Sequence, residues 1–530
     1  MWGSAVFSSM SAAPGPGSEM AAIPCSDLAS FTLQRAPQLG DKPALVDSST
    51  GRGLSYAELE RSVRRLAAGL AARGFAKGDT CCLCVPNMPE FAIAFHGVVA
   101  AGGRCTTANP LYTARELGHQ LADTDARLLV TVPSSLEVAR EAAEVTGCEI
   151  FVVGDADDAA PFSALLGDAD AAPDVSIDPD TDIAAILYSG GTTGLPKGVL
   201  LSHRNLVATL ALGEQPMALT VNDVSLAALP FFHVFGLHVV LNFALQAGAT
   251  VVAMQRFELT QFLGSIERYR VTRGYVVPAI AHALAENPAV GQCDLSSLRH
   301  VLSGAAPLGR ELTEATEAAL DCPLTEGFGM TEMSAITHLV PPFGAERKPG
   351  SIGPPIAGVE CRLVDPDTGQ DVSPGERGEL WMRSPKVMRG YLNNPEGTAA
   401  MIDADGWLRS GDIAVVDADG WFSVVGRIKE IIKYKGFQVF PAELEMILTG
   451  HPGVSDCAVV GVPDEAAGEV PKAFVVPKGG DLDPDSVIQH VAEQVAPHKR
   501  IRAVEFIDEI PKSQSGRILR RLLLEREPAP

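Results

Sequence analysis

The sequence predicts an α/β protein in which a large N-terminal body of sheet layers is followed by a small α+β domain. Short apolar runs alternate with Ala-rich amphipathic segments through most of the chain, a pattern typical of helices packed on largely parallel sheet. The chain has 530 residues, of which 46% are hydrophobic, so it contains enough apolar material for more than one domain.

The elements of the N-terminal body begin with a helix. YAELERSVRRLAAGLAAR, at 56–73, has the apolar spacing of an amphipathic helix, and 91–101 repeats that spacing. The runs at 80–85, 128–132 and 149–153 are short and apolar, as buried strands are. These elements predict the alternating layers of an α/β body.

Two longer stretches follow in the body. Residues 226–245 are nearly all apolar, but Pro230, His233 and Asn242 interrupt them. We therefore expect a buried helix there and not a membrane span. Residues 155–180 are acidic and rich in Ala and Pro, which predicts a connection on the surface.

The final hundred residues have the length and pattern of one small domain. Predicted helices at 441–448 and 485–495 flank predicted strands at 457–462 and 472–476. Residues 1–19 are rich in Ser, Ala, Gly and Pro and lack the basic start of a signal peptide, so we expect a disordered leader. The predicted organisation is a leader at 1–22, an N-terminal domain at 23–426 and a mobile C-terminal cap at 427–530.

Composition excludes several kinds of partner and site. The formal net charge of -23 repels nucleic acid and anionic membrane surfaces, so we expect neither nucleic-acid binding nor membrane insertion. Cys81, Cys82 and Cys84 lie in one apolar run, and no second ligand pair follows at finger-like spacing, so a buried strand is predicted instead of a metal site. Free thiols favour a reducing compartment, and we predict a cytoplasmic protein.

A glycine-rich loop follows the strand pattern at 183–188. Its glycines let the backbone approach a polyanion, its hydroxyls can donate hydrogen bonds, and its lysine adds positive charge. Pro196 and Gly198 flank the lysine, so the loop is not a Walker A motif. The predicted phosphate-binding residues are Ser189, Gly190, Gly191, Thr192, Thr193, Gly194 and Lys197.

The segment YSGGTTGLPKGV resembles the phosphate-binding signature of the adenylate-forming superfamily, which includes acyl-CoA ligases, luciferases and peptide synthetase adenylation domains. The resemblance spans about 31–524 and is most specific to the 4-coumarate and cinnamate:CoA ligases. It implies an enzyme that uses ATP, Mg²⁺ and coenzyme A to convert a small carboxylic acid to its acyl-adenylate and then to acyl-CoA. The supporting motifs are LPFFHVFGL (229–237), SGAAPLG (303–309), GFGMTE (327–332), SGD (410–412), GRIKEIIKYKGFQV (426–439) and PKSQSGRILRR (511–521).

The resemblance also implies a nucleotide site. A flat adenine suits the backbone of Gly327 beside the ring of Phe328, and Thr331 would donate to the α-phosphate. Glu326 is placed at the nucleotide too, although coumarate ligases usually carry Gln there. The remaining implied contacts are Glu332 with Mg²⁺, and Asp412 and Arg427 with the ribose.

The implied acid pocket departs from the family pattern. Phe235 stands where hydroxycinnamate ligases commonly have Tyr, and Val239 stands where they often have Ser. Both changes remove a hydroxyl partner for a para-hydroxyl group, so we expect cinnamate or another apolar acid to be accepted at least as well as 4-coumarate. The predicted pocket residues are His233, Phe235, Val239, Gly304, Ala305 and Leu339, and His233 would also guard the route of the thiol.

The resemblance implies that the cap swings about a hinge near Lys429 between two half-reactions. In the first pose the family brings a lysine to the reacting carboxylate, but here Arg517 occupies that place. Three outcomes stay open: Arg517 serves with altered geometry, Lys512 substitutes for it, or adenylation is slow. In the second pose the residues implied near the adenylate and CoA are Lys433, Lys435, Gly436, Gln438 and, on the large domain, Arg256.

The functional prediction is therefore an AMP-forming acid–thiol ligase of the cinnamate/4-coumarate type, with His233, Thr331, Lys433 and Arg517 as its catalytic residues. Two alternatives stay open at this point. One is a ligase for medium-chain acids or a carrier-protein thiol. The other is an adenylate-binding protein with weakened adenylation, which the replacement of lysine by Arg517 suggests.

Overall fold

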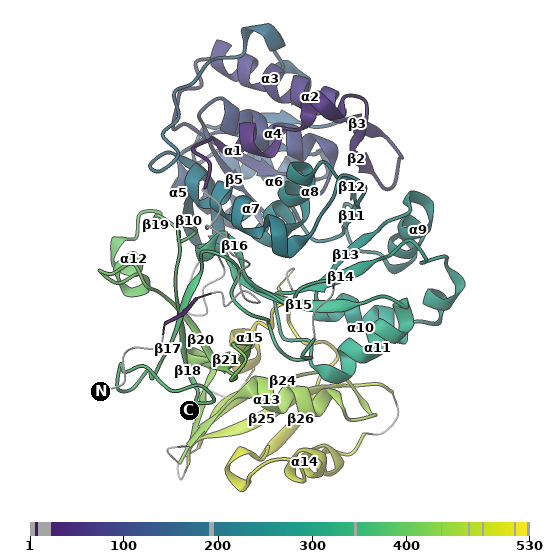
Figure 1. Cartoon of the computed structure of the whole chain (residues 1–530), viewed down its shortest axis with the longest axis vertical. Coiled ribbons are helices and arrows are strands. Elements are labelled where there is room, and N and C mark those ends of the chain that lie inside the picture. Colours follow the sequence, from purple (N-terminus) through teal and green to yellow (C-terminus); the bar gives the residue numbers. More distant parts are fainter. Residues whose placement is uncertain are drawn as a thin grey trace, which may run out of the picture.

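The computed structural model describes residues 6–8, 23–189, 196–343, 347–435, 437–464, 467–479, 482–513 and 516–526. Figure 1 shows a large body above a smaller C-terminal domain. This arrangement confirms the predicted fold class. The helices of the body lie at Leu28–Thr32 (α1), Ala36–Leu39 (α2), Tyr56–Ala72 (α3), Pro89–Ala100 (α4), Ala114–Thr124 (α5), Leu136–Ala143 (α6), His203–Met217 (α7), Phe243–Ala247 (α8), Leu259–Tyr269 (α9), Pro278–Glu286 (α10), Arg310–Leu320 (α11) and Pro395–Met401 (α12).

The first sheet of the body carries the predicted phosphate loop at the end of one of its strands. Its central strands run parallel, and Cys81, Cys82 and Cys84 are buried free thiols within one of them, as predicted. In sheet order the strands are Gly390–Tyr391 (β19), Lys197–Ser202 (β10), Ile183–Ser189 (β9), Arg104–Thr107 (β5), Thr80–Cys84 (β4), Ala126–Thr131 (β6), Glu149–Val152 (β7) and Ala160–Pro161 (β8).

A second sheet packs beside the first. One of its parallel strands contains the start of the GFGMTE motif, which is predicted to lie at the nucleotide. In order, its strands are Ala335–Leu339 (β16), Leu324–Met330 (β15), His300–Ser303 (β14), Arg273–Val276 (β13), Val224–Ala227 (β11), Thr250–Ala253 (β12), Pro43–Asp47 (β2) and Gly53–Ser55 (β3). α3 starts where the sequence predicts, because Ser55 and Glu58 form a capping box at its N-terminus.

The predicted buried helix at 226–245 is confirmed only for the second half of the segment. The segment starts inside β11, turns at Pro230, and only then becomes helical as the π-helix η4 (Phe235–Asn242) followed by α8. Proline lacks the N–H that a helix interior needs, so the helix begins after it. Across the described residues, no helix is both long enough and apolar enough to span a bilayer.

A third sheet of the body leads the chain towards the C-terminal domain. Its strands, in order, are Phe7–Ser8 (β1), Glu360–Val364 (β17), Gly378–Arg383 (β18), Leu408–Val416 (β20) and Phe422–Arg427 (β21). The predicted disorder of the leader is wrong for β1, which pairs with β17 and places the Phe7 ring 6.0 Å from Phe422. The rest of the leader lies outside the described residues. β21 ends one residue after the predicted domain boundary.

The C-terminal domain has a core of its own, formed by residues such as Val459 and Val475. Its strands are Phe437–Val439 (β23), Ile432–Tyr434 (β22), Gly468–Pro477 (β25), Val454–Asp464 (β24) and Ala503–Phe506 (β26), and its helices are Pro441–Thr449 (α13), Pro484–Ala492 (α14) and Arg520–Leu524 (α15). The domain contacts the body through an ion pair between Lys478 and Glu286, and Arg377 of the body lies over the Phe440 ring. These contacts hold one face of the domain against the body (Figure 1).

Candidate active site

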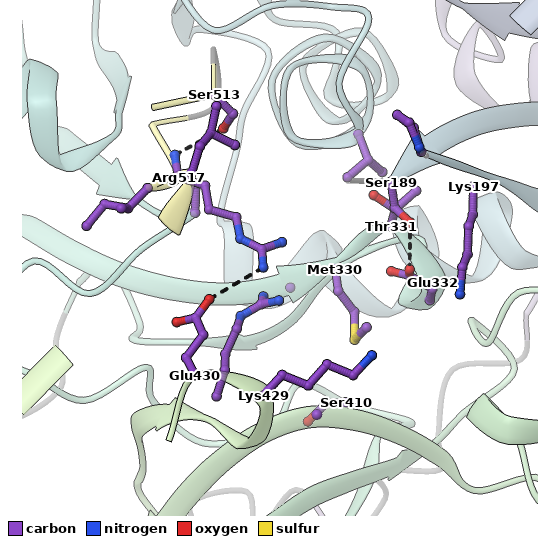
Figure 2. Close-up of a pocket in the computed structure, with 18 of the residues that line it drawn as sticks. Ser189, Lys197, Met330, Thr331, Glu332, Ser410, Lys429, Glu430, Ser513 and Arg517 are labelled. Carbon is purple, nitrogen blue, oxygen red and sulfur yellow. Dashed lines mark hydrogen bonds and ion pairs between the residues drawn. The ribbon is translucent and has the colours of Figure 1, made fainter. Parts of the chain in front are cut away.

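A cavity of about 1150 Å³ opens between the body and the C-terminal domain. Its walls come from the ends of β9, β14, β15 and β21, from η4, and from the segment before α15. Figure 2 shows Ser189, Lys197 and Glu332 on one side of this cavity and Arg517 on the other. The tertiary structure therefore joins motifs that lie more than 300 residues apart in the sequence.

Glu332 is held by two hydroxyl groups. Ser189 Oγ donates to Glu332 Oε1 over 2.8 Å, and Tyr391 Oη donates to the same oxygen over 2.8 Å. Lys197 Nζ lies 4.8 Å from the centre of the Tyr391 ring. Tyr391 was missed by the sequence analysis, since only the pairing of β19 with β10 brings it to this wall. The predicted residues Gly190, Gly191, Thr192, Thr193 and Gly194 lie outside the described residues.

Buried Asp412 forms an ion pair with the partly exposed Arg427 beside the cavity. The two residues face each other in the register of β20 and β21, and Arg427 Nε lies 3.1 Å from Asp412 Oδ1. Burial raises the pKa of Asp412 to about 6, although the charges of Arg427 and Arg517 oppose that shift. Arg427 lines the cavity, whereas Asp412 is buried beside Gly411 and does not line it.

Arg517 enters the cavity from the C-terminal domain. Its guanidinium lies 3.7 Å from Glu430, and its backbone N–H donates to Ser513 Oγ over 3.1 Å (Figure 2). Burial lowers the pKa of Arg517, and the nearby Arg427 lowers it further. Lys512 instead forms an ion pair with Asp456 over 2.6 Å and does not line the cavity. Of these two cations, Arg517 is the one that lines the cavity.

The apolar end of the cavity contains most of the predicted acid pocket. Phe235 and Val239 project from η4, opposite Gly304 and Ala305. A methyl group at Gly304 would come within 2.9 Å of the Phe235 ring, so glycine keeps the slot open. His233 lines the same end, and burial lowers its pKa to about 4, which leaves it neutral at pH 7.

Two of the predicted site residues do not line the cavity. Glu326 does not line the cavity; its carboxylate accepts hydrogen bonds from the backbone N–H groups of Leu308 (3.0 Å) and Gly350 (3.2 Å). These two hydrogen bonds tie the Glu326 carboxylate to the backbone at Leu308 and Gly350. Leu339 is buried behind Gly327 and does not line the pocket either.

The other predicted nucleotide residues meet at the centre of the cavity. Gly327, Phe328 and Thr331 line it from β15 and the turn after it, and Lys429 lines it from the short helix η7 (Ile428–Glu430). The residues expected near CoA lie away from it: Lys433, Lys435, Gln438 and Arg256 are exposed and outside the cavity lining, and Gly436 lies outside the described residues. The C-terminal domain thus presents Arg517, and not Lys433, to the cavity.

Family models account for most of the chain. Residues 33–392 match the model described as AMP-binding enzyme, and 443–517 match the AMP-binding enzyme C-terminal domain. The chain belongs to the family of AMP-binding enzymes. Among its relatives in this family, 4-coumarate–CoA ligase 5 of Oryza sativa subsp. japonica is 43% identical over 93% of each chain. 4-coumarate–CoA ligase 1 of Petroselinum crispum is 42% identical over 94% of each chain.

Solved structures of AMP-binding enzymes share the whole fold. ATP-bound MatB from Rhodopseudomonas palustris superposes with a TM-score of 0.86 and 31% identity, covering 94% of this chain and 98% of that one. The anthranilate CoA ligase AuaEII, in complex with anthranoyl-AMP, superposes with a TM-score of 0.87 and 28% identity, covering 95% and 97%. Both domains of this enzyme therefore have counterparts in these structures.

Proposed function

We propose that this enzyme is an ATP-dependent acid:CoA ligase whose acid is an aryl acid of the cinnamate or 4-coumarate class. The observation that carries the proposal is the single cavity that joins Lys197, Glu332 and Arg517 to the apolar slot between Phe235 and Ala305. Its relatives named 4-coumarate–CoA ligases support the choice of acid.

In the first half-reaction, the acid carboxylate attacks the α-phosphorus of ATP and pyrophosphate leaves. Lys197 and Arg517 lie on opposite walls, so they would bracket the phosphates and the incoming carboxylate with positive charge. Thr331 would donate to the α-phosphate. No covalent bond to the protein is needed, because holding the two anions in line and stabilising the developing charge supplies the rate enhancement.

Glu332 would hold the Mg²⁺ that accompanies ATP. Its Oε1 is fixed by Ser189 and Tyr391, and among the described residues no hydrogen bond engages Oε2. One oriented carboxylate suits Mg²⁺, which takes few protein ligands and completes its shell with phosphate oxygens and water. When bound, the cation neutralises phosphate charge and orients the leaving pyrophosphate.

In the second half-reaction, the CoA thiol attacks the acyl carbonyl and AMP leaves. We infer that the C-terminal domain turns about Lys429 and brings Lys433, Lys435, Gly436 and Gln438 to the cavity, with Arg256 meeting the CoA phosphates. Movement of a domain between two steps is an established way of remodelling one site. Neutral His233 lies beside the carbonyl end, where it would line the path of the thiol.

A panel assay tests the proposed function. Purified enzyme is incubated with ATP, Mg²⁺, CoA and a series of aryl, medium-chain and short-chain acids, and both AMP and acyl-CoA are measured. We expect equal amounts of AMP and acyl-CoA with cinnamate-type acids. AMP release without acyl-CoA, or turnover only with a carrier-protein thiol, would contradict the proposal.

The apolar lining predicts the order of two substrates. Because Phe235 and Val239 offer no hydroxyl, a buried para-hydroxyl on the substrate loses its water partners at a cost of roughly 1–3 kcal/mol. We expect kcat/KM for cinnamate to equal or exceed that for 4-coumarate, and Phe235→Tyr to shift the ratio towards 4-coumarate. A wild-type preference for 4-coumarate that Phe235→Tyr leaves unchanged would contradict this prediction.

Nucleotide affinity should depend on pH through Asp412, whose pKa in the free enzyme is about 6. Ribose hydroxyls that donate to the carboxylate favour its charged form, so the bound state has the lower pKa. Affinity for ATP should therefore be constant above pH 7 and fall by up to about tenfold per pH unit below pH 6. The measurement is the ATP Kd from pH 5 to 8 in wild type and Asp412→Asn, because titration of ATP itself cancels in their ratio. Parallel pH profiles would refute the assignment.

A further inference from the structure

Asp123, near the end of α5, binds two segments of the cavity wall at once. Tyr188 Oη donates to Asp123 Oδ2 over 2.5 Å. Asn393 Nδ2 donates to Asp123 Oδ1 and to the Asp123 backbone carbonyl, each over 3.1 Å. A carboxylate can accept from both donors because each of its oxygens is an acceptor.

The same two segments supply both hydroxyl groups that hold Glu332. Ser189 directly follows Tyr188 at the end of β9, and Tyr391 precedes Asn393 by two residues. Ser189 and Tyr391 donate to the same oxygen of Glu332, at 2.8 Å each. The position of Glu332 Oε1 therefore depends on the relative position of two segments that Asp123 joins.

The hydrogen bonds to Asp123 come from one strand, through Tyr188, and from one turn, through Asn393. Asn393 has a φ of 52°, in the left-handed region that asparagine tolerates better than most residues, and its side chain ties this turn to Asp123. Tyr188 is half-buried, and burial together with the charge of Asp123 raises its pKa, so its hydroxyl remains a hydrogen-bond donor. β9 and β19 are not neighbours in the sheet, since β10 lies between them. Asp123 thus bridges across β10.

We propose that Asp123 is a positioning residue for the Glu332 carboxylate, acting through Tyr188–Ser189 on one side and Asn393–Tyr391 on the other. This inference rests on the proposed role of Glu332 in holding the Mg²⁺ of MgATP. Residues that orient a metal-binding side chain typically change metal affinity by about 10–100-fold when they are replaced. Asp123 itself does not line the cavity and is not a catalytic residue.

The test compares ATP binding with and without the metal, by calorimetry on the full chain. Asp123→Asn keeps the size of the side chain but removes its charge and turns one acceptor oxygen into an amide donor, so Tyr188 and Asn393 can no longer both donate to it. We expect its Kd for ATP with Mg²⁺ to rise about tenfold, at the lower end of the range for such residues. The Kd for ATP in EDTA should change less than twofold, because that complex has no metal for Glu332 to hold.

Two further variants sharpen the measurement. Tyr188→Phe removes one hydroxyl, and we expect a smaller change in the same direction that is not additive with Asp123→Asn. Asp125→Asn is the matched control. Asp125 is exposed, has a φ of 50° that asparagine also tolerates, and among the described residues no hydrogen bond or ion pair joins its side chain to either segment. We expect its Kd values to match the wild type in both conditions.

Conversion of a supplied acyl-adenylate to acyl-CoA gives an independent readout, because it needs neither triphosphate nor its metal. We expect Asp123→Asn to leave this rate within twofold of the wild type. Equal weakening of ATP binding with and without Mg²⁺, or no weakening, would overturn the inference. If Asp123→Asn does not fold, Tyr188→Phe is judged by the same criterion.

The control for the proposed function is the wild type itself. If wild-type affinity for ATP is independent of Mg²⁺, the role proposed for Glu332 falls and this inference falls with it. If the wild type depends on Mg²⁺ and Asp123→Asn depends on it equally, only the role of Asp123 is overturned.

Discussion

Arg517→Ala is expected to slow acyl-adenylate formation by about 10²–10³-fold, the range found when one preorganised donor is removed from a charge-stabilising site. Arg517 reaches the cavity from the wall opposite Lys197. Its neighbours Arg520 and Arg521 also line the cavity, but Arg520 is paired with Glu430 and Glu445, and Arg521 with Glu525. Lys512 is paired with Asp456 and does not line the cavity. The measurement is pyrophosphate release from acid and ATP in single turnover.

The second half-reaction provides the internal control for Arg517→Ala. Thioester formation from a supplied acyl-adenylate should remain within a few-fold of wild type, since in the proposed second pose the C-terminal domain presents another face to the cavity. Arg526→Ala, a surface arginine 3.5 Å from Glu505, is the matched control and should leave both rates unchanged. Glu430 keeps a partner in Arg520 at 2.8 Å, so loss of Arg517 should not unfold the domain. Equal losses in both half-reactions would indicate a structural role for Arg517.

Arg517→Lys tests whether the site is adapted to arginine or whether the arginine slows acyl-adenylate formation. The related enzymes that the sequence resembles use lysine here, and a compact ammonium differs from a planar guanidinium in reach and geometry. We expect Arg517→Lys to increase pyrophosphate release. A decrease would show instead that the surroundings, including Glu430 and Arg427, are shaped for the fork of an arginine.

Glu332→Gln is expected to lower kcat/KM for ATP in the adenylation step by about 10²–10³-fold, because a metal ion at the phosphates contributes several kcal/mol of charge stabilisation. Glutamine keeps the size of the side chain and can still accept from Ser189 and Tyr391, but it removes the charge that binds the cation. The measurement is pyrophosphate release as a function of Mg²⁺ concentration, and the half-maximal concentration should rise.

Two comparisons interpret the Glu332→Gln result. The exposed Glu314, 3.8 Å from Arg310 on α11, supplies a matched Glu314→Gln control that should behave as wild type. Conversion of a supplied acyl-adenylate should be nearly unaffected by Glu332→Gln, because the triphosphate is no longer present. An unchanged Mg²⁺ dependence would remove Glu332 from the metal site.

Local patterns predicted most of the elements but not every boundary. The helix at 56–73 and the strands at 80–85 and 149–153 lie within a residue or two of the predicted positions, since each has its own apolar period and end signals. The segment at 226–245 was predicted as one helix, because periodicity does not distinguish a buried strand from a buried helix in a continuous apolar run. β1 could not be predicted, because its partner β17 lies about 350 residues away.

Residue types and spacing alone predicted the chemical groups of the site: a glycine- and hydroxyl-rich loop with Lys197, carboxylates within short motifs, and an apolar slot without a hydroxyl at Phe235. Those features are local, so their residue types and spacing suffice to predict them. Contacts that exist only in the folded chain place Glu332 and not Glu326 at the cavity, bring the Tyr391 hydroxyl to Glu332, join Tyr188 to Asp123, and carry Arg517 in from the second domain. The physical reason is that these relations depend on strand pairing and domain contacts between distant segments, and no local pattern encodes them.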